Sequence, residues 1–218
     1  MERFFILDKY NTFLDWDLIL TAKDVASPEL KTNNVDLDGM DGTLDLSEAL
    51  TGTISYTDRT VTATFWTDYG TREERVLLLR NIRQVLHGKK VKIVEPDDPE
   101  HYLYGRVKIK DEVNNRVYAT FTIEAVCEPW RYTLTDLVRN VSITEDQSVD
   151  VVINNNGVKT LLPTVTVSGS VSITYDGVTT SLTDGTYTIS SLKLYQGTNI
   201  INVTGNGSVS FTYKEGDI

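Results

Sequence analysis

The densest group of possible metal ligands is a carboxylate-rich stretch at residues 36–45, which alternates Asp with Gly, Leu and Met. Such a run could coordinate calcium through its oxygens, but its spacing does not match an EF-hand loop. Counting from Asp36 places Met40 at a ligand position, Asp41 where the turn glycine belongs and Ser47 where the bidentate Glu belongs. The sequence therefore favours a turn that tolerates positive φ, followed by a short helix-like piece at residues 47–50 that ends at Gly52.

A second acidic run could in principle supply a catalytic acid and base. It contains Asp97, Asp98 and Glu100, and the two histidines of the chain are His87 and His101. No nucleophile turn accompanies them, and their spacing fits neither a catalytic triad nor a metal site. We interpret this run as a solvated turn and expect no enzymatic activity.

The single cysteine, Cys127, ends an apolar run and is expected to be a buried, inert thiol. It rules out a disulfide within the chain. The sequence also contains neither a phosphate-binding P-loop nor a G-x-G-x-x-G stretch. We therefore expect no cofactor and no metal.

The chain of 218 residues carries a formal net charge of −10. This acidity argues against tight phosphate binding, which requires clustered Lys and Arg, but it suits a protein past which a polyanion must move. No apolar run is long enough to cross a bilayer, and charged residues interrupt the N-terminus too early for a signal peptide. The expectation is a protein without membrane insertion.

Residues 59–132 contain the elements that must position any site. One helix is predicted at residues 72–87, because Thr71 and Glu74 form a capping box and Gly88 suits a left-handed helix end. Its apolar positions recur at helical spacing and predict one buried stripe. They are Leu78, Leu79, Ile82, Val85 and Leu86.

Strand patterns surround this helix. Asn114-Asn115 is expected to form a tight hairpin turn, and Gly105 is expected to mark a β-bulge because the apolar parity changes beside it. The predicted strands and extended segments cover residues 60–66, 91–94, 102–110 and 116–126, two strands within 4–20 including a half-buried one at 13–18, and residues 31–37.

The composition changes after residue 132, where Ser, Thr, Val, Asn and Gly become frequent and no helical period appears. Asp176-Gly177 between β-branched residues predicts a two-residue hairpin. Short strands about ten residues apart predict a sandwich or barrel, so we expect a second domain. Its predicted strands are 149–153, 164–167, 171–175, 178–182, 187–189, 192–195, 200–204 and 209–213.

Tyrosines recur along these C-terminal strands, at Tyr175, Tyr187, Tyr195 and Tyr213. Exposed, they would form a platform for sugars. The favoured interpretation places them at the edge of the core, where the ring is buried and the hydroxyl stays hydrated.

Five short motifs, in order over nearly the whole chain, resemble the distal tail proteins of siphophages that infect Gram-positive hosts. Each motif alone has little specificity, and the resemblance depends on their order. The motifs are Gly39 to Ser47 (GMDGTLDLS), Leu86 to Lys89 (LHGK), Tyr102 to Val107 (YLYGRV), Ala125 to Tyr132 (AVCEPWRY), and Gly197-Thr198-Asn199 with Phe211 to Gly216 (FTYKEG).

The resemblance implies a mainly β protein of two domains. Residues 1–135 would form a ring-forming domain like a tail-tube protein, a β-barrel or split sandwich with one helix, and residues 136–218 a galectin-like β-sandwich. Six copies would form a hexameric ring around the DNA channel at the tail tip of the virion. Its expected partners are the tail tube protein and the tip or baseplate proteins, and the protein would be made in the bacterial host cytoplasm.

Within that interpretation DNA passes without specific binding. Acidic side chains facing the channel would prevent adhesion, and the candidates are Asp36, Asp38, Asp41, Asp97 and Asp98. The alternative is a carbohydrate-binding adhesion module that recognises a cell-wall saccharide. The chain is short and has no room for an inserted carbohydrate-binding module, which makes direct glycan binding the weaker interpretation.

Overall fold

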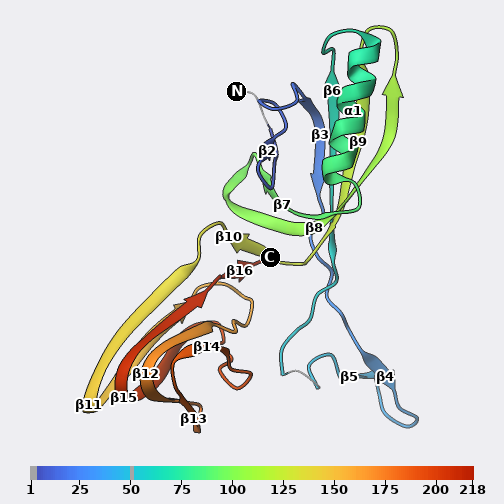
Figure 1. The fold of residues 1–218 in the computed structure, drawn as a ribbon. Helices are drawn as coiled ribbons and strands as arrows, with labels where there is room; N and C mark the ends of the chain where they lie inside the picture. The colour runs from blue at the N-terminus through green and yellow to red at the C-terminus, as the bar shows by residue number, and fades with distance from the viewer. Residues whose placement is uncertain (1–3, 50–51) are drawn as a thin grey trace. The chain divides into compact units, whose positions relative to one another are not determined.

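The computed structural model describes residues 4–49 and 52–218. Internal contacts divide the chain into two units, Met1–Arg131 with Ile218 and Tyr132–Asp217, which we describe separately. Both are built from antiparallel strands, and the described residues contain one helix (Figure 1). The predicted fold class, mainly β with a single helix, is confirmed.

The first unit is organised around one antiparallel sheet. Its strands follow the order β2-β1-β7-β8-β9-β6-β3. The strong pairings in its centre join β6, β8 and β9. The sequence pattern predicted both ends of β6 and the last residue of β9 within one residue, but it began β9 three residues early and stopped four residues short at each end of β8. The strands are β1 (Ile6–Leu7), β2 (Tyr10–Asn11), β3 (Ile19–Val25), β6 (Arg59–Thr67), β7 (Lys90–Glu95), β8 (Asp98–Asn114) and β9 (Ala119–Cys127).

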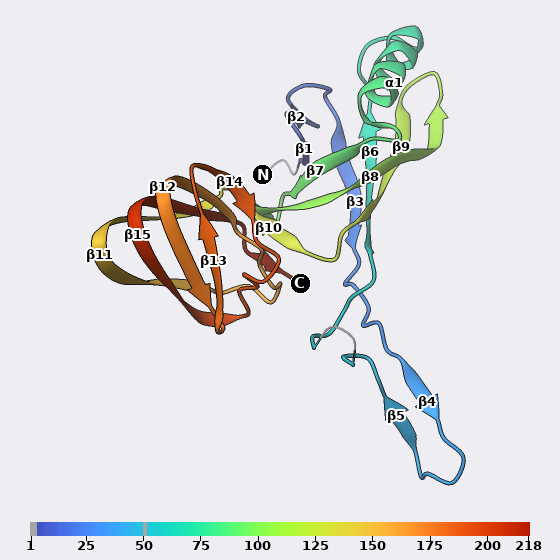
Figure 2. The same ribbon diagram turned by 60° about the horizontal axis from the view of Figure 1, so that its bottom comes forward.

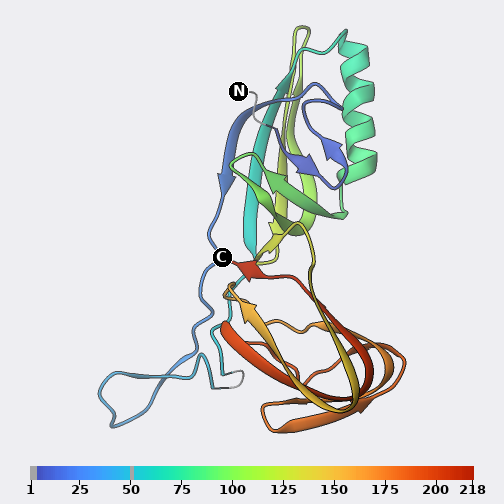
Figure 3. The same ribbon diagram turned by 90° about the vertical axis from the view of Figure 1, so that its left-hand side faces the viewer.

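Helix α1 (Arg72–Leu86) has the predicted ends. The Thr71 amide donates to Glu74 Oε2 at 2.7 Å, and the Glu74 amide donates to Thr71 Oγ1 at 3.3 Å, so the capping box is complete. Gly88 follows with a φ of 78°. The helix buries Leu79, Ile82 and Leu86 in the core of the sheet, each worth about 2 kcal/mol in transfer free energy. Figure 3 shows α1 on one side of the strands β6 and β9.

The half-buried strand predicted at residues 13–18 is wrong. Residues 12–16 form turns, because Asn11 Oδ1 accepts hydrogen bonds from the amides of Phe13 and Leu14, both at 3.0 Å. Asp17 adopts a φ of 51°, and Leu14 is 77% exposed. Local side-chain bonding to the backbone has overridden the apolar alternation, and the strand begins later, as β3.

The bulge predicted at Gly105 is also wrong. Pairing of β7 with β8 continues without a shift through Val91↔Gly105, and the irregularities of β8 lie elsewhere, opposite the end of β7 and before Val113. Close packing explains the glycine instead. A Cβ at Gly105 would stand 2.4 Å from Cys127 Sγ, so only a residue without a side chain fits here.

Residues 26–58 leave the sheet between β3 and β6, and we call them the arm (Figure 2). A hairpin of β4 (Asn34–Asp36) and β5 (Thr43–Asp45) forms its central part. None of its described residues is buried. The helix-like piece predicted at residues 47–50 is a turn at 47–49, with the Gly52 amide bonded to the Glu48 carbonyl at 2.8 Å, and Leu50 lies outside the described residues.

The second unit contains long strands that curve strongly (Figure 2). Strands β12 and β15 each join two segments that the sequence pattern separated, while the strand predicted at 192–195 is reduced to an isolated bridge, Leu161↔Leu194. The hairpin at Asp176-Gly177 is confirmed, with φ values of 48° and 74°. The strands of its sheet are β11 (Leu137–Asn155), β12 (Thr164–Tyr175), β13 (Val178–Leu182), β14 (Gly185–Thr188) and β15 (Gly197–Tyr213). The short strands β10 (Arg131–Thr133) and β16 (Gly216–Asp217) pair with each other outside this sheet.

Three glycines let these long strands bend. Gly169, Gly205 and Gly207 have positive φ, and a Cβ at any of them would lie 2.1 to 2.4 Å from a carbonyl oxygen of the neighbouring strand. The irregularity of β11 between Ile143 and Gln147 falls at the same level. Each strand therefore bends over the core rather than ending there, which explains why the sequence pattern was read as two shorter strands.

Candidate functional site

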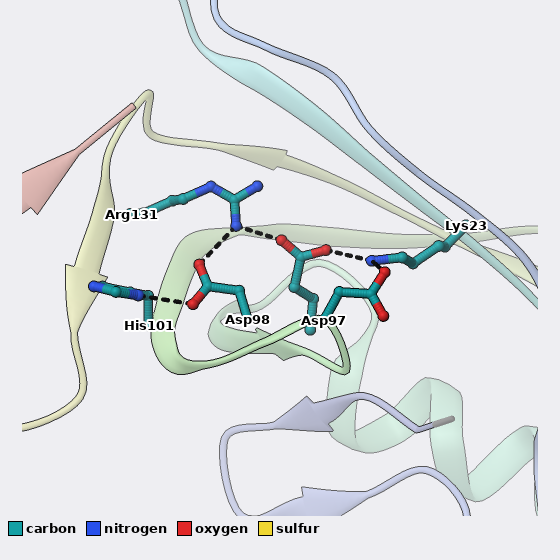
Figure 4. A network of polar contacts seen from close by, with 6 residues as sticks. Lys23, Asp97, Asp98, His101 and Arg131 are labelled. Atoms are coloured by element: carbon teal, nitrogen blue, oxygen red, sulfur yellow. Dashed lines mark hydrogen bonds and ion pairs between the residues drawn. The ribbon is translucent and has the colours of Figure 1, made fainter. Parts of the chain in front are cut away.

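A network of ion pairs lies where β7 turns into β8 (Figure 4). The Glu95 side chain is 7% exposed. Its Oε2 lies 2.6 Å from Lys23 Nζ of β3, and its Oε1 forms an ion pair with Arg131. Arg131 also contacts Asp98 Oδ2 at 3.0 Å. Lys23 contacts Asp97 at 2.8 Å, and His101 Nδ1 lies 2.7 Å from Asp98. The network joins three distant parts of the sequence.

These contacts keep Glu95 ionised. Burial by itself would raise the pKa of the Glu95 carboxyl, but hydrogen bonds from Lys23 and Arg131 outweigh burial and lower the pKa. A carboxylate held in this way is a poor general acid. The acidic turn is thus only partly solvated: Asp97 and Asp98 share Lys23 and Arg131 with Glu95, whereas Glu100 is exposed, and the shared contacts fix the sheet end.

The remaining titratable candidates have structural contacts. His87 Nδ1 accepts the Ile109 amide at 3.1 Å, which places it at the side of β8. Burial raises the pKa of the Cys127 thiol to about 12, so the thiolate that a nucleophile requires does not form near neutral pH. Within residues 4–49 and 52–218, no three His, Cys, Asp or Glu side chains are grouped to hold a metal ion.

A cleft of about 370 Å³ lies between the turn at residues 14–17 and the start of α1. Trp16 and Leu78 supply apolar surface, and Asp15, Asp17 and Glu74 stand around it. Glu74 is already engaged in the helix cap. The lining contains neither a nucleophile with a base nor two convergent donors, so the cleft suggests no reaction.

The five acidic candidates fall into two groups. Asp36, Asp38 and Asp41 lie in the hairpin of the arm and are exposed, whereas Asp97 and Asp98 belong to the ion-pair network. The arm also exposes large apolar side chains on a segment without a core of its own, which marks an interaction surface. They are Leu30, Leu37, Met40, Leu44 and Ile54.

The sheet of the first unit has two unpaired edges. Strand β3 is the last in the order, and among the described residues no strand pairs with its outer side. At the other side, β7 pairs with β8 up to Arg106, and Val107 and Ile109 still bond to Lys89 and His87, so the open stretch on this side of β8 begins after Ile109. Unpaired edges offer backbone donors and acceptors to another chain.

Three of the tyrosines considered for a sugar platform pack against the core of the second unit. They are Tyr175, Tyr187 and Tyr213. The fourth, Tyr195, is exposed. Tyr175 also donates its hydroxyl to Asn199 Oδ1 at 2.8 Å. The predicted core-edge placement fits these rings, and carbohydrate binding stays an untested prediction.

Sequence reasoning missed Lys23 and Arg131 as partners of the acidic run, because their positions are 72 and 36 residues from Glu95 and no local pattern connects them. It also missed the free edge at β3 (Ile19–Val25), since no strand was predicted beyond residue 20 in this region. The available signal was the run of carboxylates that follows Glu95 at the end of a buried strand, because a buried carboxylate requires cations from other parts of the chain.

No family model matches the chain. No curated protein matches it either. Among solved structures, the crystal structure of SPP1 Dit (gp 19.1), named a paradigm of the hub adsorption apparatus in Gram-positive-infecting phages, is similar with a TM-score of 0.70. The likeness covers 100% of both chains at 14% sequence identity. It establishes a shared fold along the full length. No helix in the described residues has the length and apolar character that crossing a membrane requires.

Proposed function

We propose that this chain is a structural hub of a phage tail tip. The observation that carries the proposal is the full-length likeness to SPP1 Dit, a hub protein, at a TM-score of 0.70. The order of short motifs in the sequence points the same way independently. The protein acts by assembly and by contacts between surfaces, without catalysis.

The hub is a ring of six copies that joins the tail tube to the tip or baseplate proteins and surrounds the DNA channel. Two unpaired edges on one sheet support this form, because the β3 edge of one copy can pair with the β8 edge of the next. Such a head-to-tail contact differs on its two sides, so repetition closes a ring when the rotation permits. The number six rests on the resemblance alone.

The arm provides a second contact between copies. Its apolar side chains are exposed in the single chain, and burying them against a neighbour removes them from water. The triple variant L37S/M40S/L44S should weaken the ring, measured by light scattering as a shift of the assembly midpoint to at least tenfold higher protein concentration, while the melting temperature of the single chain is unchanged.

A control places two Ser substitutions at exposed apolar residues outside the arm. The control variant L162S/V178S changes two exposed residues of the second unit and leaves the arm intact. It should assemble like the natural protein. Equal assembly of arm variant and control would remove the arm from the ring contact. A protein that stays a single chain at every concentration, also with its tail tube protein, would contradict the ring itself.

The acidic candidates remain part of this proposal, with unequal weight. Asp36, Asp38 and Asp41 form no ion pair in the described residues, so they can repel DNA, whereas Asp97 and Asp98 share Lys23 and Arg131 with Glu95. Replacing the three arm acids by Lys should slow DNA release from assembled particles. Unchanged ejection kinetics would argue that these acids do not face the channel.

A further inference from the structure

One face of the sheet in the first unit combines cations with threonines in cross-strand rows. The rows follow from the pairing registers of five strands, so their members are direct neighbours. Read from β7 or β8 across β9 and β6 toward β3, the rows are Lys90-Arg106-Val126-Thr60, Lys108-Glu124-Thr62-Asp24 and Lys110-Thr122-Thr64-Ala22. We call this surface the cationic face.

The cationic face is opposite to the core. Along β9 and β6 the alternate residues Phe65, Phe121 and Ile123 point into the core with α1, which leaves the row residues on the other side. Lys90, Arg106 and Lys108 are exposed. Among the described residues, the row residues belong to no buried hydrophobic cluster, so the face is suited to meet water or a polar partner.

The charge of this face is opposite to that of the whole chain. Four cations stand against two carboxylates, and Glu124 is bound to Lys110. Lys90, Arg106 and Lys108 form no ion pair with a carboxylate in the described residues, although Lys108 lies opposite Glu124 and helps to lower its pKa. Arg106 donates to the Gly88 carbonyl, and Lys90 lies over the Tyr104 ring. In a chain of net charge −10, three unpaired cations concentrated on neighbouring strands are a localised exception that favours an anionic partner.

We propose that the cationic face contacts the phosphate backbone of double-stranded DNA during its passage. Lys and Arg, with hydroxyls such as those of Thr60, Thr62 and Thr64, are donors that proteins direct to phosphate oxygens. The sheet surface presents no helix or ribbon to enter a groove, so the contact is independent of sequence. This inference rests on the proposed function, because it assigns the channel wall of that ring.

The contact must be weak to let DNA move. About three phosphate contacts give a salt slope near −2.7, so affinity should fall roughly fortyfold over a fourfold rise in salt. A cationic wall and an acidic arm are compatible, because weak contacts with the wall exchange rapidly as DNA slides, while the acids of the arm repel it.

The test uses the full-length protein and a fluorescent duplex DNA, with binding followed by anisotropy from low to physiological salt. The variant K90Q/R106Q/K108Q should lose the salt-dependent binding, with the magnitude of the slope reduced by about 2.7. The control K9Q/K31Q/K193Q removes three exposed lysines from other positions and should bind like the natural protein. All three proteins should melt at similar temperatures.

Three results would overturn the proposal. The natural protein could fail to bind DNA at low salt, or the control could weaken binding as much as the variant. The variant could also lose ring assembly yet keep DNA binding, which would assign the cationic face to contact between copies, including contact with the acidic arm. If the natural protein binds DNA as predicted but never forms rings, the proposed function is contradicted, while the assignment of the cationic face to DNA binding stands.

Discussion

The outer sheet faces of the two units are both rich in hydroxyls, but they use them differently. In the second unit the polar side chains bond to one another: Asn202 donates to Ser148 at 2.8 Å and to Asp150 at 2.7 Å, and Ser172 lies 2.9 Å from Ser181. In the first unit the threonines accompany Lys90, Arg106 and Lys108, which form no ion pair with a carboxylate in the described residues. The polar side chains on the face of the second unit form hydrogen bonds with one another, whereas the face of the first unit keeps cations that can bind a partner.

The edges and loops show the same difference. The first unit has an exposed arm and two unpaired edges, and the polar contacts that it does complete are concentrated at Glu95. The second unit bends its strands through Gly169 and Gly207 so that they cover their own core. The first unit is therefore suited to assembly, and the second to stability by itself.

The largest effect is expected where the second unit bends. In Gly207→Ala the new Cβ would stand 2.1 Å from the Ser168 carbonyl oxygen, at a φ of 149°. Backbone cannot yield as a side chain can, so the free energy of unfolding should fall by about 4 kcal/mol, measured by urea denaturation. Gly177→Ala is the control, because its Cβ meets nothing within 4 Å, and it should cost about 1 kcal/mol. An equal loss of stability in the two variants would show that the bend is not the reason for the glycine at position 207.

The ion-pair network of the first unit should give the next largest effect. Glu95→Gln leaves Lys23 and Arg131 short of a buried carboxylate, and the free energy of unfolding should fall by about 3 kcal/mol. Glu124→Gln removes a partner of Lys110 in a more exposed pair and should change it by about 0.5 kcal/mol or less. Thermal melting of both variants tests whether the contribution of an ion pair to the free energy of unfolding depends on its burial.

Acid should weaken the same network. Because the pKa of Glu95 is lowered on folding, its contribution is complete above the ordinary pKa of a glutamate and is lost as the pH falls through the folded value. Urea unfolding at neutral and acidic pH should show a smaller acid loss in Glu95→Gln than in the natural protein. An identical pH dependence of the two proteins would place the acid sensitivity elsewhere.

The smallest effect is expected on the self-satisfied face. Asn202→Ala removes two hydrogen bonds near the surface and should lower the free energy of unfolding by about 1 kcal/mol, since net contributions of such bonds are modest. Ring assembly and DNA binding should not change. A variant that loses either activity would show that this face, too, serves a partner.

Local chemistry made part of the fold predictable. The cap of Thr71 and Glu74, the glycine after α1 and the Asp176-Gly177 turn act within a few residues, and sequence pattern found them. Residues 13–18 were misread because the Asn11 side chain satisfies the backbone locally, which apolar spacing does not reveal.

Long-range partners were beyond such reasoning. The acids Asp97 and Asp98 were recognised as unusual, but their cations come from β3 and from Arg131, and only the folded sheet brings these together. The cationic face was equally hidden, because its rows depend on register between strands far apart in the chain.

Native mass spectrometry of the full-length protein tests the central claim most directly, recorded over a range of concentrations and with the tail tube protein present. The account predicts a dominant species of six chains, each of 24.5 kDa. A single chain under all of these conditions, or an open series of masses without a preferred closed number, would contradict it.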